Sequence, residues 1–190
     1  MPLPPSADRE LIHTRSLDIR IYRLADGLWD VEGRLIDVKP FEYSMLDSTR
    51  AADEPIHDMS LRLTIDRELE VRAAVAHMDQ GAHGICHRIA PDYGKLVGLR
   101  IGAGWVRRAR ERLGGIKGCT HLTEMLGQMA TAALQAMWAE REAEQVARTG
   151  RYELSEGVIN TCHTYRQDSS YVATYFPEHH RPAAPGENGG

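Results

Sequence analysis

The chain has few cysteines and few aromatic residues, and it has no long apolar run. Its three cysteines are an odd number, and no secretion signal precedes them. This argues against a disulfide framework and predicts reduced thiols that are free to bind metal or to react. No stretch is long enough to span a bilayer, and the N-terminus has no basic region followed by an apolar run. We therefore expect a soluble, cytoplasmic protein without a membrane partner.

Neither sign of charge dominates the chain, and several local motifs are missing. The 23 Lys and Arg residues against 27 Asp and Glu residues give a net charge of -4. The arginines of segment 107–112 are interleaved with Glu111, which is typical of a solvated helix face, so we expect no nucleic-acid partner. The chain contains no close CxxC or HExxH spacing, so no local zinc motif is predicted. The segment Gly102-Ala103-Gly104 is too short for a phosphate loop, which argues against a nucleotide cofactor.

The length of 190 residues fits one domain with a substantial core. Both ends are rich in proline or glycine, a composition typical of loose segments. We expect a single α+β domain over residues 10–181 with flexible termini at residues 1–9 and 182–190. The sequence leaves open whether this domain forms a homo-oligomer.

The first ordered half alternates apolar and polar residues, which is the period of β-strands. Residues 17–21 and 28–38 flank the turn Asp26-Gly27 and predict one hairpin, in which Gly33 marks a bulge. Residues 59–65 and 69–75 flank a second turn and predict another hairpin. Together the two hairpins predict an antiparallel meander with one apolar face that needs a cover.

The second half changes to a helical period. Helical segments are predicted at residues 91–98 and 104–113, followed by a long helix from Cys119 to about Arg148 with one apolar stripe. For residues 158–176, a peripheral strand and a lid both remain open. Strands followed by helices predict an α+β fold with helices on one sheet face.

Potential ligands gather at three places, each at the end of an expected element, where function is usually placed on a rigid scaffold. The three places are His57-Asp58 before the third strand, His83, Cys86 and His87 after the fourth strand, and Cys119 with His121 at the helix start. Two Cys with one or two His would suit Zn or Fe, whereas one Cys with an acid-base partner would suit nucleophilic catalysis. Cys162-His163 is a further candidate pair.

Cys119 is the strongest single candidate. Unpaired N–H groups and the positive end of the dipole at a helix N-terminus favour a thiolate over a thiol. The alternative interpretation is that Cys119 is a small buried residue and His121 an N-terminal polar contact. For His57, a hydrogen bond to a loop is the alternative to ligation.

Part of the chain, residues 55–140, resembles the NifU/IscU iron-sulphur scaffold fold. The resemblance is carried by segments 57–66 and 116–122 and by the loop that contains Cys86. In those scaffolds a ligand precedes the strand, one Cys follows the hairpin and another begins the last helix. Here Pro55-Ile56 replace the Cys before the strand and Gly118 replaces the His before the helix. A cradle of three Cys is thus not preserved, whereas a single Zn or Fe ion with mixed ligands remains open.

A second resemblance runs over most of the chain. Segments 28–33, 57–59, 96–102, 118–122 and 162–163 look like those of a bacterial family catalogued as a domain of unknown function. One branch of that family is associated with the release of formaldehyde from a hydroxymethyl side chain of lignin-type aromatic dimers. The resemblance therefore implies a lyase that acts on a small aromatic substrate.

Three functions follow as hypotheses. The first is the formaldehyde-releasing lyase, the second is a metal or iron-sulphur carrier, and the third is a transferase or hydrolase that uses Cys119 with His121. The lyase needs a base for the hydroxyl proton and a positive group for the developing phenoxide. For these roles we expect His121 or Asp58 as the base, His57, Cys86 and Cys119 as metal ligands, and Tyr22, Trp29 and Trp105 as walls for an aromatic substrate.

Overall fold

The computed structural model describes residues 8–154 and 156–182. It consists of two compact units, Met1–Trp138 and Ala139–Gly190. The expected flexible termini lie almost wholly outside the described residues. The expectation of one domain over residues 10–181 stays a prediction.

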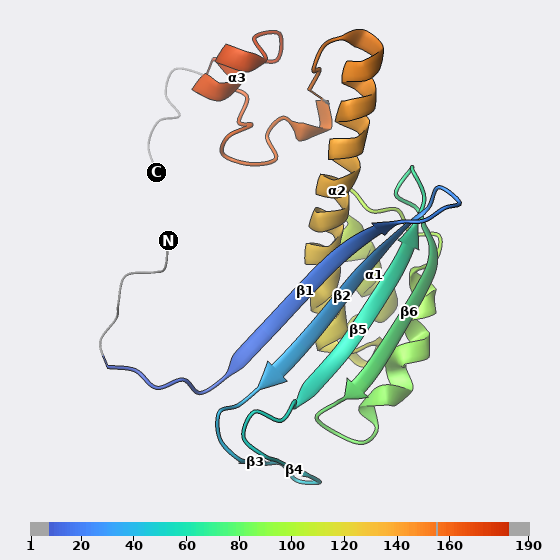
Figure 1. Cartoon of the computed structure of the whole chain (residues 1–190), viewed down its shortest axis with the longest axis vertical. Helices are drawn as coiled ribbons and strands as arrows, with labels where there is room; N and C mark the ends of the chain where they lie inside the picture. Colours follow the sequence, from blue (N-terminus) through green and yellow to red (C-terminus); the bar gives the residue numbers. More distant parts are fainter. Residues whose placement is uncertain (1–7, 155, 183–190) are drawn as a thin grey trace. The chain divides into compact units, whose positions relative to one another are not determined.

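The first unit contains a four-stranded antiparallel sheet in the order β1-β2-β5-β6 (Figure 1). The strands are β1 (Thr14–Arg23), β2 (Trp29–Val38), β5 (His57–Ile65) and β6 (Val71–Gln80). A short hairpin of β3 (Tyr43–Ser44) and β4 (Thr49–Arg50) lies in the connection between β2 and β5. Both hairpins expected from the alternation are present.

One face of this sheet forms the core. Odd-numbered residues of β2 and β5, among them Val31 and Leu63, are buried, whereas the even-numbered Arg34 and Arg62 face away from the core. This follows from the period of two, which sends successive side chains to opposite faces. The structure is thus an α+β fold whose sheet has one apolar face.

Helices cover that apolar face. They are the 3-10 helices η1 (Cys86–Leu96) and η2 (Gly115–Lys117), and the α-helices α1 (Trp105–Leu113) and α2 (Thr120–Thr149). The N-terminal half of α2 inserts Leu122, Met125, Leu126 and Met129 into the same core as the sheet. The long helix therefore begins one residue after Cys119, close to its predicted start. Segment 91–98, expected as a helix, belongs mostly to η1, which begins earlier, at Cys86.

Gly33 is not a bulge. It pairs in regular register with Ile19 of β1 and Leu61 of β5. A Cβ atom at Gly33 would lie 2.9 Å from the Met129 sulfur, closer than side chains normally approach. The glycine is there because α2 packs closely against the sheet at this point.

The second unit has its own small core, made by Leu154, Val158, Val172 and Phe176. It contains η3 (Glu156–Val158) and α3 (Ser170–Tyr175). The Ser169 hydroxyl caps α3 by accepting a hydrogen bond from the Val172 N–H at 3.1 Å. Residues 156–182 contain no strand, so the strand interpretation of this segment was wrong. Nowhere in the described parts of the chain is a helix both long and apolar enough to cross a membrane.

Candidate functional site

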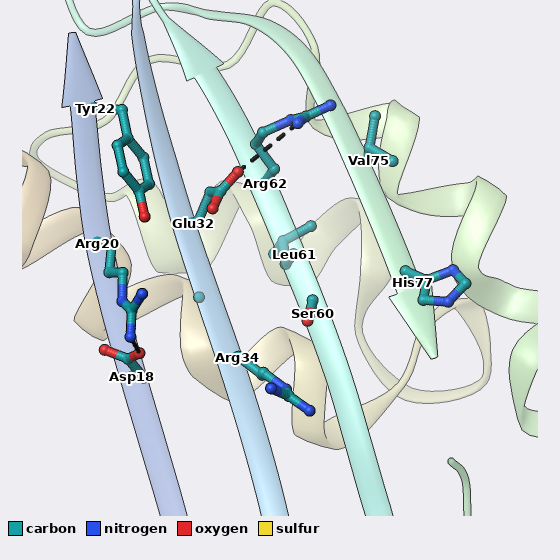
Figure 2. Close-up of a pocket in the computed structure, with 11 residues that line it drawn as sticks. Asp18, Arg20, Tyr22, Glu32, Arg34, Ser60, Leu61, Arg62, Val75 and His77 are labelled. Carbon is teal, nitrogen blue, oxygen red and sulfur yellow. Dashed lines mark ion pairs between the residues drawn. The ribbon is translucent and has the colours of Figure 1, made fainter. Parts of the chain in front are cut away.

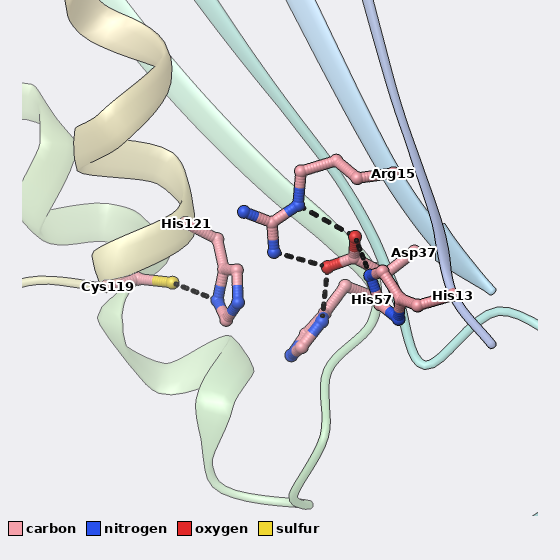
Figure 3. A network of polar contacts seen from close by, with 6 residues as sticks. All are labelled: His13, Arg15, Asp37, His57, Cys119 and His121. Atoms are coloured by element: carbon pink, nitrogen blue, oxygen red, sulfur yellow. Dashed lines mark hydrogen bonds and ion pairs between the residues drawn. The ribbon is translucent and has the colours of Figure 1, made fainter. Parts of the chain in front are cut away.

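A buried carboxylate, Asp37, lies at the centre of a polar cluster at one end of the sheet (Figure 3). The register places Arg15 of β1 directly opposite Asp37 on one side and His57 of β5 opposite it on the other. All three are odd-numbered and extend the row of core-facing positions. Side chains directly opposite each other in antiparallel strands are close enough to interact. The cluster is therefore a cross-strand row in which polar residues replace apolar ones.

Asp37 accepts four hydrogen bonds through its two carboxylate oxygens. Oδ1 accepts from Arg15 Nε at 2.7 Å and from His13 Nε2 at 3.1 Å. Oδ2 accepts from Arg15 Nη2 at 2.7 Å and from His57 Nδ1 at 2.9 Å. Burial by itself would raise the pKa of Asp37, but the hydrogen bonds from Arg15 and His57 lower it to about 2. Asp37 is thus an ionised group that holds its neighbours in place.

These contacts fix the tautomer of His57. An ionised carboxylate can only accept hydrogen bonds, so Nδ1 of His57 carries the proton that it donates to Asp37. In the neutral ring, Nε2 then has a free lone pair. His57 is thereby prepared to take a proton or to bind a metal through Nε2.

His121 faces His57 from the first turn of α2. The two ring centroids lie 3.9 Å apart, with an interplanar angle of 37°. Burial lowers the pKa of His121, and the nearby charges of His57 and Arg15 lower it further. His121 is therefore neutral at pH 7. Its Nδ1 lies 3.8 Å from the Cys119 sulfur, so the two candidates at the helix start do reach one small volume.

Tyr93 fixes the start of α2. The phenol of this fully buried residue donates to the Cys119 carbonyl at 2.9 Å and accepts from the Cys119 N–H at 3.1 Å. It also lies 2.8 Å from the Thr123 hydroxyl. Burial is the main reason that the pKa of Tyr93 is raised, which keeps its phenol protonated. Through these contacts η1 positions Cys119, and with it the first turn that carries His121.

The cluster opens into a cavity of about 720 Å³. This volume lies within the range of small-molecule sites. Strands β1, β2 and β5, the β3–β4 hairpin, the loop after β6 and α2 contribute its walls. The lining residues are His13, Arg15, Asp37, Lys39, Tyr43, Ser44, Met45, Leu46, Ile56, His57, Ala82, His83 and His121.

Within residues 8–154 and 156–182, one group of three side chains has the spacing of a metal site. Ligand atoms of Asp37, His57 and His121 all lie within 4.8 Å of one another. Asp37 already accepts four hydrogen bonds, so it suits the role of a group that orients a ligating histidine. The donors that fit an ion are therefore His57 Nε2 and His121, with the Cys119 sulfur nearby.

Asp58 does not belong to this cluster. Its side chain is on the other face of the sheet, where Arg34 donates to it from Nε at 2.8 Å and from Nη2 at 2.6 Å. Neighbouring residues of a strand point to opposite faces, so His57 and Asp58 cannot share one site. The expectation that Asp58 acts as a base beside His57 was wrong for this reason.

Cys86 is likewise outside the group of three ligands. It begins η1, is half-buried, and packs against the core and against Gly81. We expected His57, Cys86 and Cys119 to lie together. Cys86 is not part of the group, and His121 and Asp37 lie beside His57 instead. Cys162 is exposed and lies in the second unit.

The three aromatic residues expected to bind a substrate lie elsewhere. Trp29 and Trp105 are buried in the core, and Trp105 Nε1 donates to the Leu126 carbonyl at 2.9 Å. Trp29 is at the opposite end of β2 from Asp37, roughly 27 Å away along the strand. Tyr22 lines a separate cavity of about 360 Å³ on the charged face of the sheet (Figure 2).

Sequence reasoning missed Asp37, Arg15 and His13. A signal for Asp37 was present, because it continues the odd-numbered row of Leu35 on β2 and is thus a charged residue at a core-facing position. A buried carboxylate requires partners, which makes such a position a candidate site.

A family model described as a protein of unknown function, DUF2889, matches residues 13–135. These residues include the whole sheet, α1, the first half of α2 and every residue that lines the cavity. No curated protein and no solved structure matches the chain.

Proposed function

Because the chain belongs to the DUF2889 family of proteins of unknown function, we propose its function from the chemistry of the cavity around His57. We propose a carbon-carbon lyase that releases formaldehyde from the hydroxymethyl group of a lignin-derived aromatic dimer of the phenylcoumaran type. The observation that carries the proposal is the Asp37–His57 pair, which leaves a histidine nitrogen free at a cavity large enough for a small molecule.

The reaction needs a base at the primary alcohol. His57 Nε2 takes the hydroxyl proton, and the oxygen electrons form the C=O bond of formaldehyde as the carbon-carbon bond breaks. The electrons of that bond form the stilbene C=C bond and expel the phenoxide from the neighbouring carbon. The phenoxide then takes up the proton, so that atoms and charges balance. Asp37 fixes the tautomer of His57 and stabilises the imidazolium that forms.

Two groups are suited to the developing phenoxide. Arg15 holds Asp37 through Nε and Nη2, and its Nη1 is directed away from the carboxylate (Figure 3). His121 is neutral and offers a ring N–H on the other side of His57. Donors aimed at a developing negative charge lower the barrier most when they are already in place. This reassigns the base from His121 or Asp58 to His57 and gives His121 a stabilising role.

A metal-assisted form of the reaction would use the same residues. His57 and His121 would hold a Zn or Fe ion, with Asp37 orienting His57 from behind and the Cys119 sulfur beside His121. When bound, the ion supplies a Lewis acid for an alkoxide or phenoxide oxygen.

The close spacing of these ligands also favours a second candidate, a metal or iron-sulphur carrier with a NifU/IscU-like core. The presence of a ligand at the start of β5 and a Cys at the start of α2 supports it. The position of Cys86 outside the ligand group argues against cluster assembly. Elemental analysis separates the candidates, because a labile cluster with visible absorbance indicates a carrier, whereas one tight ion or none indicates the enzyme.

The proposed function is tested by incubating purified protein with a phenylcoumaran-type dimer and measuring trapped formaldehyde and stilbene absorbance. His57→Gln should lower the rate at least about 100-fold, the usual size of a general-base contribution. His77→Gln is the matched control, since His77 is exposed on β6 and pairs with Asp79. Absence of formaldehyde with the wild-type protein, or full activity of His57→Gln, would contradict the proposal. Metal content and rate of Cys119→Ser in the same assay show whether an ion takes part.

A further inference from the structure

We propose that Lys39 selects ligands in which an aromatic ring carries an acidic oxygen, either a carboxylate or a phenolate. The inference rests on the proposed function in one respect, since it assigns the substrate class of the same cavity. It stands on the contacts of Lys39, on the charges that line the cavity and on the apolar side chains beside them.

Lys39 is held at the cavity wall by two aromatic rings. It directly follows β2, and its Nζ lies 4.9 Å from the ring centroid of Tyr43 and 5.5 Å from that of Phe41. An ammonium at these distances is attracted to the ring face. The Lys39 carbonyl also accepts a hydrogen bond from the Asp53 N–H at 2.8 Å, which fixes the backbone. The ammonium is therefore positioned before any ligand arrives.

The charge of Lys39 is not neutralised within the described parts of the chain, where no carboxylate lies within ion-pair distance of its Nζ. The other cation of the cavity, Arg15, is compensated by its two-pronged contact with Asp37. Four histidines also line the cavity: His13, His57, His83 and His121. Of these, His83 pairs with Asp47. Since Arg15 is compensated, the excess positive charge of the lining comes from Lys39, and it favours anionic ligands and disfavours cationic ones.

Apolar side chains lie next to this positive charge. Tyr43 is 37% exposed, and Leu46, at the tip of the β3–β4 hairpin, is fully exposed. Met45, Ile56 and Ala82 complete the apolar part of the lining. An apolar wall with one fixed cation fits a ring that ends in an acidic oxygen, because the ring and the anion each have a place.

Isothermal titration calorimetry with three small probes tests this inference at pH 7. The probes are 4-methoxybenzoate, its neutral analogue 4-methoxybenzamide, and 4-methoxyphenol, which is also titrated at pH 9.5, where more phenolate is present. We expect the benzoate to bind the wild-type protein at least about tenfold tighter than the amide, or the phenol to tighten by a similar factor at high pH. The first result assigns a carboxylate to Lys39 and the second a phenolate.

Two variants separate Lys39 from the general charge of the protein. Lys39→Met should remove the preference for the acidic probe and leave binding of the amide unchanged. The control is Arg62→Met. This variant also removes one positive charge, but Arg62 lies on the opposite face of the sheet. An acidic probe that binds no better than the amide, or a preference that survives in Lys39→Met, would overturn the inference.

These measurements do not require turnover. A protein that prefers acidic probes through Lys39 but releases no formaldehyde retains this inference and loses the proposed lyase function. A protein that releases formaldehyde but shows no such preference retains the lyase function and loses this inference.

Discussion

His57 Nδ1 lies 2.9 Å from Asp37 Oδ2, and the two residues are directly opposite each other in neighbouring antiparallel strands. A sheet places these Cβ atoms within about 5.5 Å of each other by its own geometry. The pair therefore depends on strand register and not on a flexible loop. A pre-arranged acid-base group on a rigid element is what a catalytic site requires.

Replacing Asp37 by Asn should destabilise the protein by about 3–5 kcal/mol, because Arg15 and His57 lose a buried ionic partner. Asp58→Asn is a matched control, since Asp58 also accepts two bonds from one arginine, but its side chain is 11% exposed, whereas that of Asp37 is fully buried. The control should lose only about 1 kcal/mol. Urea denaturation at pH 7 measures both values, and equal losses would show that Asp37 has no special role.

The same carboxylate predicts how stability depends on pH. The pKa of Asp37 is about 2 in the folded protein, below the value of about 3.9 for an unfolded chain. Its contribution to the free energy of unfolding is thus fully present above about pH 4 and is lost as the pH falls toward 2. Asp37→Asn should lack this part of the acid dependence. Denaturation at a series of pH values, with both proteins in parallel, checks the difference.

His121 should titrate below the ordinary histidine pKa of about 6.5, since burial and the charges of His57 and Arg15 disfavour its protonated form. Protonation of His121 then favours the unfolded chain. The resulting decrease in the free energy of unfolding is absent above about pH 6.5 and grows as the pH falls toward the pKa of His121 in the folded protein. The histidine ring proton shifts in NMR spectra measure this titration. In His57→Gln the pKa of His121 should rise, because a second ring that can take up a proton is removed from 3.9 Å away. A His121 that titrates above 6.5 would contradict the geometry of the cluster.

Gly118→Ala should destabilise the protein by about 1–3 kcal/mol and displace the start of α2. A Cβ atom there would lie 2.1 Å from the Leu113 carbonyl oxygen, a backbone atom that cannot simply move aside. Gly84→Ala is the control, because nothing lies within 4 Å of the added carbon. Thermal unfolding and the rate of Cys119 alkylation report the two effects. If both variants behave like the wild type, the close approach at Gly118 does not exist.

The fold was largely predictable from the sequence. Alternation of apolar residues around Asp26-Gly27 determines the first hairpin, since each strand must bury one face and the turn must reverse the chain. The apolar stripe after Cys119 determines the long helix in the same way. These signals are local, because each depends on residues close together in the chain.

The partners in the site were decided by tertiary structure. Arg15, Asp37 and His57 meet only because β1, β2 and β5 pair in one particular register, and no local pattern states that register. Strand alternation alone excludes Asp58 from the site of His57, but the packing of α2 on the sheet was needed to bring His121 to it. The sequence by itself therefore determined the elements and the approximate places of the chemistry. Only the three-dimensional packing decided which side chains share a cavity, because contacts between distant segments follow from how whole faces are buried.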